Sequence, residues 1–334
     1  MPSRPVPMLR VLCRMSLALF GLAFTFGPRG VLGQVRPEIY PVETVTLGTQ
    51  QILSGERNGQ QTLLAGELRI PPGNGRVPAV ILVHGSDGLS LLVERWAQEL
   101  NGIGVAAFLL DSFSGRGITS TVNDQSKLHG LLLMVDAYKA LGILIKHPRI
   151  DANRIAIMGF SKGAIAAVYS SNERFRRLYA PGNNARFAAH IGLYTNCNTT
   201  FHDDDKVTDA PIRLFHGSAD DWVAIGPCRA YVDRLRKSGV DATLTEYPGA
   251  QHGYDFFFLG TEPEAHPEAT TTRNCHLEES EHGLIVNSKT GKPYDVTRDP
   301  CVERGPHLSY DEAATAATAM AVKEFLITRL RPNL

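Results

Sequence analysis

A serine between two glycines is the first feature of this chain that could carry covalent chemistry. Ser161 stands at the centre of the segment GFSKG (159–163), which fits the G-x-S-x-G pattern of a nucleophile on a sharp turn from a strand to a helix. An apolar run at 154–160 precedes it and an alanine-rich segment follows it. A simple helix N-cap is the alternative role, because serine caps helices well. The strand-to-helix context favours the nucleophile.

A serine nucleophile needs a base and an acidic residue that orients the base. In enzymes with this turn, these residues follow in the order Ser, Asp or Glu, His. The segment LFHGSADDWV (214–223) supplies Asp220 and Asp221, and YPGAQHGYDF (247–256) supplies His252. Each segment follows a predicted strand. The order therefore predicts a Ser-Asp-His triad, with two neighbouring aspartates as candidates for the acid.

Stabilising the oxyanion of an acyl intermediate requires two backbone N–H groups, one after the nucleophile and one from an earlier loop. The first falls on Lys162, and the loop LVHGSDGL (82–89) offers the second at Ser86. We expect His84 to be a structural residue at the strand end rather than a second base. This chemistry requires no cofactor.

Apolar segments that alternate with helical ones must position these loops. Predicted strands cover 77–85, 104–111, 154–160, 187–194, 211–217 and 241–249, after two early antiparallel strands at 42–53 and 61–70. Predicted helices cover 91–100, 125–146, 225–238 and 311–330. Such alternation indicates an α/β fold with a mainly parallel, doubly wound sheet and helices on both faces. Its functional loops should lie at the carboxyl ends of the strands.

One long segment interrupts the alternation. Residues 255–310 are polar, rich in turn-forming residues and without clear periodicity. A segment of that length is either a functional lid or an insertion. We expect residues 34–334 to form a single domain that carries it.

The first 33 residues have the composition of a secretory signal peptide. They contain four arginines, no acidic residue and an apolar run at 15–26. An uncleaved anchor is the alternative, although a membrane span needs about 20 apolar residues. Without those four arginines, the remaining 30 basic and 34 acidic residues give a net charge of −4. We therefore expect a secreted or periplasmic protein that binds neither nucleic acid nor, once the leader is removed, membranes.

Export changes the interpretation of the cysteines. Four remain after the leader, at Cys197, Cys228, Cys275 and Cys301. An even number in an oxidising compartment favours two disulfides. Zinc binding is the alternative, but the chain has no C-x-x-C pair. We expect no metal.

Five segments between about residues 60 and 330 fit one known family: VHGSDG (83–88), DSFSGRG (111–117), HPRIDANRIAIMGFSKGA (147–164), HGSADDWV (216–223) and PGAQHGYDF (248–256). Through them, the chain resembles the dienelactone hydrolase family of α/β-hydrolases. The resemblance implies the α/β-hydrolase fold and ester hydrolysis. The acid loop of the family, G-x-x-D-x-x-V, selects Asp220 over Asp221.

The resemblance also bears on the disulfides. Exported members of the family tend to carry cysteines around the acid loop, as Cys197 and Cys228 do here. We expect the pairs Cys197–Cys228 and Cys275–Cys301, the second closing the long insertion on itself.

Two departures from the family limit the substrate that the resemblance implies. Dienelactone hydrolases proper use a cysteine nucleophile, which Ser161 replaces here. They also carry a glutamate in the oxyanion-side loop, where this chain reads GSD (85–87). The resemblance thus supports ester hydrolysis without dienelactone as the substrate.

Together, these features predict an exported serine hydrolase that cleaves small-molecule carboxylic esters through an acyl-enzyme. Arg116, just past a predicted strand, should face the substrate, because its planar fork suits a carboxylate or carbonyl oxygen. Bracing of its loop, or a salt bridge to Asp111, is the alternative. A peptidase with the same triad, or a binding protein without turnover, are the other functions that we consider.

Overall fold

An eight-stranded sheet with one antiparallel edge forms the centre of the protein in this computed structural model, which describes residues 1–2 and 37–332. The strand order is β1-β2-β4-β3-β5-β6-β8-β9. The strands are β1 (Glu38–Thr46), β2 (Gln60–Arg69), β3 (Val77–Val83), β4 (Ala106–Asp111), β5 (Ile150–Phe160), β6 (His190–Leu193), β8 (Ile212–Gly217) and β9 (Ala242–Tyr247). Only the pairs β1·β2 and β2·β4 are antiparallel. The predicted mainly parallel sheet is thus confirmed.

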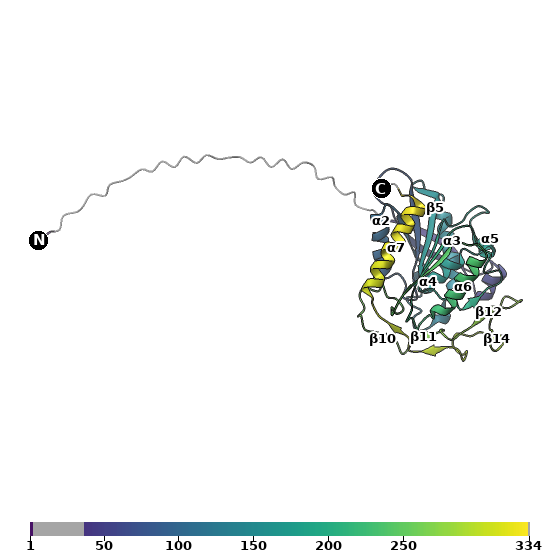
Figure 1. Ribbon diagram of the computed structural model, residues 1–334. Helices are drawn as coiled ribbons and strands as arrows, with labels where there is room; N and C mark the ends of the chain where they lie inside the picture. Colours follow the sequence, from purple (N-terminus) through teal and green to yellow (C-terminus); the bar gives the residue numbers. More distant parts are fainter. Residues whose placement is uncertain (3–36, 333–334) are drawn as a thin grey trace. The chain divides into compact units, whose positions relative to one another are not determined.

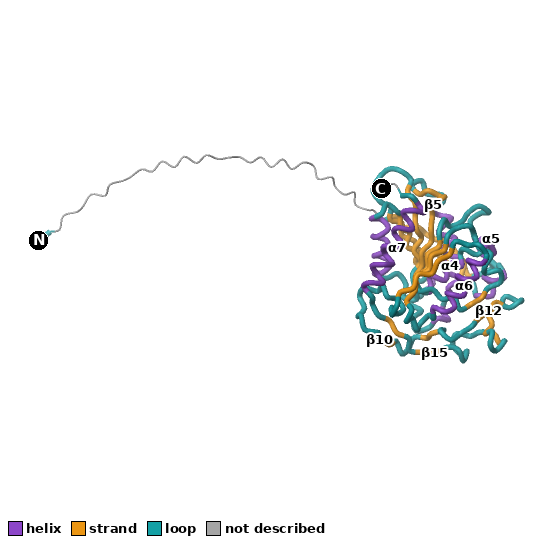
Figure 2. The backbone as a smooth tube through the Cα atoms, in the orientation of Figure 1, coloured by secondary structure: helices purple, strands orange, loops and turns teal. Residues whose placement is uncertain are grey.

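Helices cover both faces of this sheet, as predicted. The longer ones are α2 (Leu91–Gly102), α3 (Gly130–Leu144), α4 (Lys162–Tyr169), α6 (Ile225–Lys237) and α7 (Glu312–Leu330), and the shorter ones are α1 (Thr49–Ser54) and α5 (Glu173–Tyr179). Figure 1 shows α2 and α7 together on one side of the sheet, with α3, α4 and α6 on the other. The same layers of purple helix around orange strands are visible in Figure 2.

The central strand β3 explains why two helical layers are needed. All seven of its residues are buried. Ile81 and Val83 belong to the hydrophobic core under α3 and α4, whereas Val80 and Leu82 belong to the core under α2 and α7. Because successive side chains of a strand point to opposite faces, an uninterrupted apolar strand must be covered on both sides.

Several predicted boundaries differ from the structure, and two of them change the type or the start of an element. The early strand predicted at 42–53 ends at Thr46, and residues 49–54 form helix α1. Gly48 begins this helix, with its N–H donating to the Gln51 side chain, and Gly55 ends it with φ 76°. The helix predicted at 125–146 begins at Gly130, after a short 3-10 turn at Gln125–Lys127.

The 255–310 segment contains only short strands. They are β10 (Glu264–Ala265), β11 (Thr270–Thr271), β12 (Leu277–Glu279), β13 (Ile285–Asn287), β14 (Lys292–Pro293), β15 (Glu303–Arg304) and β16 (His307–Leu308). In Figure 1, this segment lies along the lower edge of the molecule, beyond the strand ends. Within this segment, β12 also pairs with β7 (Thr199–Thr200), which lies between β6 and β8 in the chain. The exposed turn 288–291 joins β13 to β14.

Two disulfides form with the predicted pairing. Cys197–Cys228 ties the loop after β6 to helix α6, and Cys275–Cys301 closes the 255–310 segment on itself. Both pairs join loops or elements near the carboxyl-end side of the sheet, so they restrain the region where the functional loops lie.

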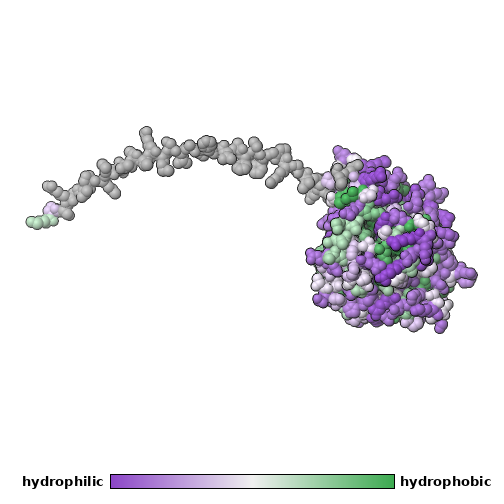
Figure 3. Space-filling model, viewed as in Figure 1, coloured by the Kyte–Doolittle hydropathy of each residue, from purple (hydrophilic) through white to green (hydrophobic). Residues whose placement is uncertain are grey.

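The predicted signal peptide covers residues 1–33, of which residues 3–33 lie outside the described residues. Among the helices that the structure describes, none combines the length and the apolar character needed to cross a bilayer. Figure 3 shows a surface that is mostly hydrophilic on the face drawn, with smaller hydrophobic areas.

The disulfide of the 255–310 segment gives a first prediction. Its ends are 26 residues apart, and closing a loop of that size stabilises by about 3–4 kcal/mol on the chain-entropy model. Replacing both cysteines (Cys275→Ser with Cys301→Ser) should speed proteolytic cleavage between residues 276 and 300 in native buffer. Mass spectrometry of the fragments would locate the cuts. Equal cleavage rates in the oxidised wild type and the variant would contradict this prediction.

Candidate active site

The turn at Ser161 is the sharpest feature at the carboxyl edge of the sheet. Ser161 joins β5 to α4 with φ 49° and ψ −113°, a conformation that side-chain-bearing residues rarely adopt. A Cβ on Gly159 would lie 2.0 Å from the Gly163 carbonyl oxygen, and one on Gly163 would lie 2.1 Å from that of Val83. Both positions of the G-x-S-x-G motif therefore require glycine.

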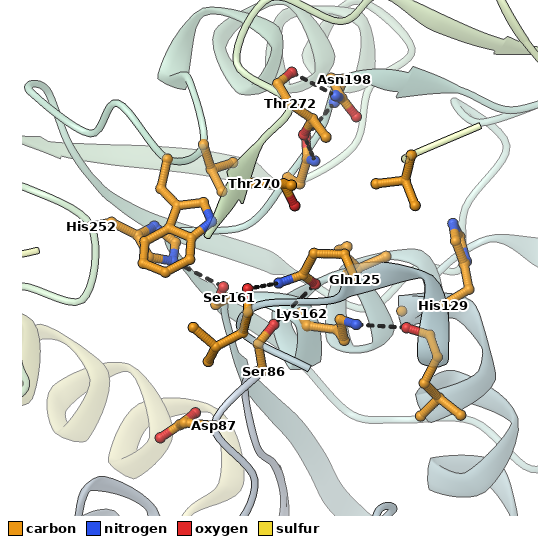
Figure 4. A pocket seen from close by; sticks show the side chains of 18 of the residues that line it. Ser86, Asp87, Gln125, His129, Ser161, Lys162, Asn198, His252, Thr270 and Thr272 are labelled. Atoms are coloured by element: carbon orange, nitrogen blue, oxygen red, sulfur yellow. Dashed lines mark hydrogen bonds between the residues drawn. The ribbon is translucent and has the colours of Figure 1, made fainter. Parts of the chain in front are cut away.

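The structure brings Ser161, His252 and Asp220 into one hydrogen-bonded chain. His252 Nε2 lies 2.9 Å from Ser161 Oγ (Figure 4). On the other side of the ring, His252 Nδ1 lies 2.7 Å from Asp220 Oδ2. Asp220 follows β8 and His252 follows β9, so the three residues come from loops at the same sheet edge. With Asp220 ionised, Nδ1 carries the imidazole proton and Nε2 is free to accept the serine proton.

Asp220 is held in place by four donors. Its Oδ1 accepts the backbone N–H groups of Trp222 (3.0 Å) and Val223 (2.7 Å). Its Oδ2 accepts from His252 and lies 3.1 Å from Nε2 of the buried His216. Burial opposes ionisation, but the two histidines outweigh it and hold the pKa of the Asp220 carboxyl well below its usual range. The carboxylate therefore stays charged at any pH near neutrality.

His216 is a contributor that the sequence analysis missed. Its Nε2 also lies 2.9 Å from the Val223 carbonyl oxygen, so that nitrogen must carry the proton and donate. The only sequence signal was a histidine at the end of β8, four residues before Asp220. A histidine at a strand end does not reveal which side chain it will contact.

Two aromatic rings flank the imidazole of His252. Tyr194 meets it edge-on at 4.9 Å between centroids, and Trp222 lies at 5.4 Å on a tilted plane. The Tyr194 hydroxyl donates to the buried Asp255 at 2.8 Å, and Trp96 Nε1 donates to the same carboxylate at 3.2 Å. Burial raises the pKa of Asp255 to about 6. These contacts fix the plane in which His252 lies.

The loop at 84–88 runs against Ser161. A Cβ on Gly85 would lie 3.6 Å from Ser161 Cβ, so Ser86 is adjacent to the turn. Ser86 and Lys162 both line the cavity above Ser161. Within the described part of the chain, neither of their backbone N–H groups donates to another protein group. Their positions leave both groups available to a ligand.

Two further side chains near this loop have structural contacts. His84 is fully buried, with Nδ1 2.8 Å from the Gly85 carbonyl oxygen while Nε2 accepts the Ser112 N–H. This is the structural role expected for it. The Lys162 ammonium donates to the Leu128 carbonyl oxygen at 2.6 Å, and burial lowers its pKa to about 7.

Arg116 does not face the cavity, so its predicted contact with substrate is wrong. Its guanidinium forms a two-pronged pair with Asp136 of α3 at 2.7 and 2.9 Å and donates to Thr46 and to the Ser112 carbonyl oxygen. The side chains of Arg116 and Asp136 are only 4% and 0% exposed. Arg116 braces its loop, and its partner is Asp136 rather than Asp111. Asp111 instead accepts backbone N–H groups from its own loop.

A cavity of about 790 Å³ opens above Ser161. One wall comes from α4 and from the loops that carry Ser86, Ser161 and His252. The other comes from the 255–310 segment, which contributes Phe256, Phe258, Leu259, His266, Thr270, Thr272, Leu277, Tyr294, Asp295, Val296 and Leu308. The segment therefore lines the site as a wall. Among the residues that the structure describes, no group of three His, Cys, Asp or Glu side chains is arranged to hold a metal ion.

Asp221 fastens this wall to the acid loop. Its carboxylate accepts the His307 backbone N–H at 2.8 Å and lies 2.8 Å from His307 Nδ1 and 3.1 Å from an Arg273 nitrogen. Thr271 adds a hydrogen bond from its hydroxyl to the Trp222 carbonyl oxygen at 2.8 Å. The neighbouring aspartates thus have separate partners, Asp220 toward His252 and Asp221 toward the wall.

Comparison with known proteins agrees with this fold. The profile of the dienelactone hydrolase family matches residues 64–329, and the chain belongs to that family of hydrolases. A probable 2-oxo-3-(5-oxofuran-2-ylidene)propanoate lactonase of Bradyrhizobium sp is 24% identical over 217 residues, which are 60% of this chain and 82% of that protein.

Solved structures of similar proteins have the same fold. A dienelactone hydrolase-like promiscuous phosphotriesterase from metagenomic libraries is 17% identical, with a TM-score of 0.55 over 88% of this chain and 98% of that one. Esterase 2 of Thermogutta terrifontis, phosphonylated by cyclosarin, is 17% identical with a TM-score of 0.50, covering 68% and 87%. At these identities, the likeness concerns the fold alone.

The buried pair of Arg116 and Asp136 gives a second prediction. Removing one partner of a buried ion pair leaves an uncompensated charge, so Arg116→Ala should lower the free energy of unfolding by about 3–5 kcal/mol. The matched control is Arg177→Ala, at an exposed position, which should change it by less than about 0.5 kcal/mol. Urea titration measures both. A stable Arg116→Ala with a raised KM for every ester tested would restore the substrate-facing role.

Proposed function

We propose that this protein is a serine hydrolase that cleaves carboxylic esters through an acyl-enzyme on Ser161. The observation that carries the proposal is the continuous hydrogen-bonded chain from Ser161 Oγ through His252 to the buried Asp220. Membership of a hydrolase family and a fold shared with esterases support the same conclusion. The three side chains are in contact in the order that acyl transfer requires of a nucleophile, a base and an orienting acid.

In the first half of the reaction, His252 Nε2 takes the proton of Ser161 Oγ as that oxygen bonds to the ester carbonyl carbon. The carbonyl oxygen becomes an oxyanion and accepts hydrogen bonds from the N–H groups of Ser86 and Lys162. His252 then returns the proton to the departing alkoxide, whose bond to the acyl carbon breaks. Asp220 keeps the imidazole in the correct tautomer and stabilises its charged form.

In the second half, a water molecule replaces the alcohol. His252 accepts a proton from this water as its oxygen attacks the acyl-enzyme, and the same two N–H groups receive the oxyanion. Breakdown of the intermediate returns the proton to Ser161 and releases the carboxylic acid. Donors placed where the charge develops contribute about 10²–10³ in rate each. The whole cycle uses only groups of this chain and water.

The same triad could act on amides, so a peptidase is the alternative enzyme. A binding protein without turnover is the other alternative, since a fold does not determine a function. Parallel assays on matched ester and peptide substrates separate the three. Turnover of neither substrate, with no covalent labelling, would favour the binding protein.

We also propose that the protein is exported after removal of residues 1–33, and that residues 34–334 act as one domain. The two disulfides support this, because such bonds persist in oxidising compartments. N-terminal sequencing of the mature protein tests the cleavage site. A mature chain that retains its first 33 residues would contradict the signal peptide.

The nucleophile gives a third prediction. A serine-directed phosphonate should label the wild type at Ser161, located by peptide mass spectrometry. Ser161→Ala should lose the label and lower kcat by about 10⁶, the scale seen when a triad serine is removed. The fold should persist, because alanine is smaller than serine. As a control, Ser238→Ala, at an exposed position, should keep both label and rate. Label recovered on another serine would overturn the mechanism.

The neighbouring aspartates give a fourth prediction. Asp220→Asn should lower kcat by about 10⁴, because an amide favours the wrong tautomer of the base. Asp221→Asn is the matched control one residue away. It should reduce kcat by less than about tenfold, because the protein keeps the catalytic pair, but it should lower the melting temperature through lost contacts with His307 and Arg273. Equal losses of kcat in both variants would contradict the assignment.

A further inference from the structure

Three polar atoms in the wall of the cavity have no partner. They are His266 Nε2, Thr270 Oγ1 and Tyr294 OH, each buried without a hydrogen bond in the described part of the chain. All three residues line the cavity above Ser161 and all belong to the 255–310 segment. Buried polar groups are normally paired, and an unpaired one costs about 1–3 kcal/mol. Three such atoms in one wall indicate that a ligand supplies their partners.

Neighbouring polar residues of the same segment are paired, which makes the three unpaired atoms distinct. Thr271 donates to two backbone carbonyls, and Thr272 accepts from Asn196 through its hydroxyl and from Asn198 through its carbonyl. In Figure 4, hydrogen bonds join Thr272 to its partners, whereas the Thr270 hydroxyl points into the cavity on the side of Ser161 and Gln125.

The ring of His266 locates these atoms relative to the triad. His252 and Trp222 lie 5.4 Å apart between centroids, and Trp222 and His266 lie 5.8 Å apart. The Trp222 indole therefore neighbours both imidazole rings, that of His252 and that of His266. Because His252 protonates the departing alkoxide, the alcohol part of an ester lies on the His252 side of Ser161. His266 thus borders the region that the alcohol part occupies, and Thr270 and Tyr294 line the same cavity.

The backbone holds these residues in fixed positions. The His266 N–H donates to the Pro306 carbonyl oxygen at 2.8 Å, and the Tyr294 N–H donates to that of Ile285 at 2.9 Å. Thr270 pairs with Arg304 in the β11·β15 ladder. Polar groups that are fixed before binding set the orientation of a ligand at little entropic cost.

We propose that this wall is a subsite for an alcohol moiety consisting of a ring that carries hydroxyl groups. The flat indole of Trp222 and the side chains of Phe256 and Leu308, which line the same cavity, contact the ring. His266, Thr270 and Tyr294 bond its hydroxyls. The inference rests on the proposed function: Ser161 and water cleave the acyl carbon–oxygen bond, the ring oxygen leaves with a proton from His252, and the acyl group leaves as the acid. A sugar and a polyhydroxylated aromatic share this chemistry.

Two matched pairs of acetates test the proposal. A monoacetate of methyl glucopyranoside is compared with cyclohexyl acetate, and 2-hydroxyphenyl acetate is compared with phenyl acetate. For at least one pair, the wild type should have a kcat/KM about tenfold or more higher for the hydroxylated member, since one hydrogen bond is worth about that factor. Preference in the first pair alone identifies a sugar, and preference in the second alone identifies an aromatic ring.

Variants that remove only the polar atom complete the test. Thr270→Val, Tyr294→Phe and His266→Phe should each lower kcat/KM for the preferred hydroxylated substrate by about five- to tenfold. The kcat/KM for the matched substrate without hydroxyls should stay unchanged. Thr261→Val and Tyr310→Phe are the matched controls, from the same segment but outside the cavity wall. They should leave kcat/KM unchanged for both substrates.

Two results would overturn the inference while the proposed function stands. One is equal kcat/KM within both pairs in a wild type that still hydrolyses the acetates and is labelled at Ser161. The other is a variant that slows both members of a pair equally, since that marks a structural role. Absence of hydrolysis and of label would instead remove the proposed function, and the subsite with it.

Discussion

The backbone of Ser161 is the constraint on which the site depends. Its positive φ is tolerated because Gly159 and Gly163 let strand, helix and the Val83 carbonyl approach within distances that no Cβ allows. The strain is offset by the packing of β5 at the centre of the sheet and by the bond from the Ser161 N–H to Leu193. Backbone strain of this kind persists only where the surrounding structure enforces it. The eight-stranded sheet therefore keeps Ser161 in its strained conformation.

The acid loop connects the chemistry to the shape of the cavity. Asp220 contacts the His252 imidazole and Asp221 contacts the wall of the cavity. Both aspartates lie in one short segment after β8. Trp222 contributes to both, since its N–H binds Asp220 and its indole lies between His252 and His266. A displacement of the wall would therefore also displace the surroundings of His252. This coupling explains why a segment of irregular structure is tied down by a disulfide and by several polar contacts.

The sequence predicts the sheet and the proximity of three loops, because carboxyl ends of parallel strands meet at one edge. It could not predict the direction of a long side chain. Arg116 follows its strand as expected, yet Asp136, in a helix 20 residues later, draws it into the interior. Likewise, the apolar residues of 49–54 fit a strand or a helix equally well, and Gly48 with Gln51 decides for the helix. His216 and the unpaired wall atoms are visible only when distant segments are seen together.

The 255–310 segment has one side that lines the cavity and a tip that does not. The turn at 288–291 is exposed, joins β13 to β14 and contributes nothing to the lining. Exposed loop tips tolerate added residues because no buried backbone bonds are broken. For immobilising this protein on a support, that turn offers a tether point outside the cavity lining, within the stretch of chain that the Cys275–Cys301 disulfide closes.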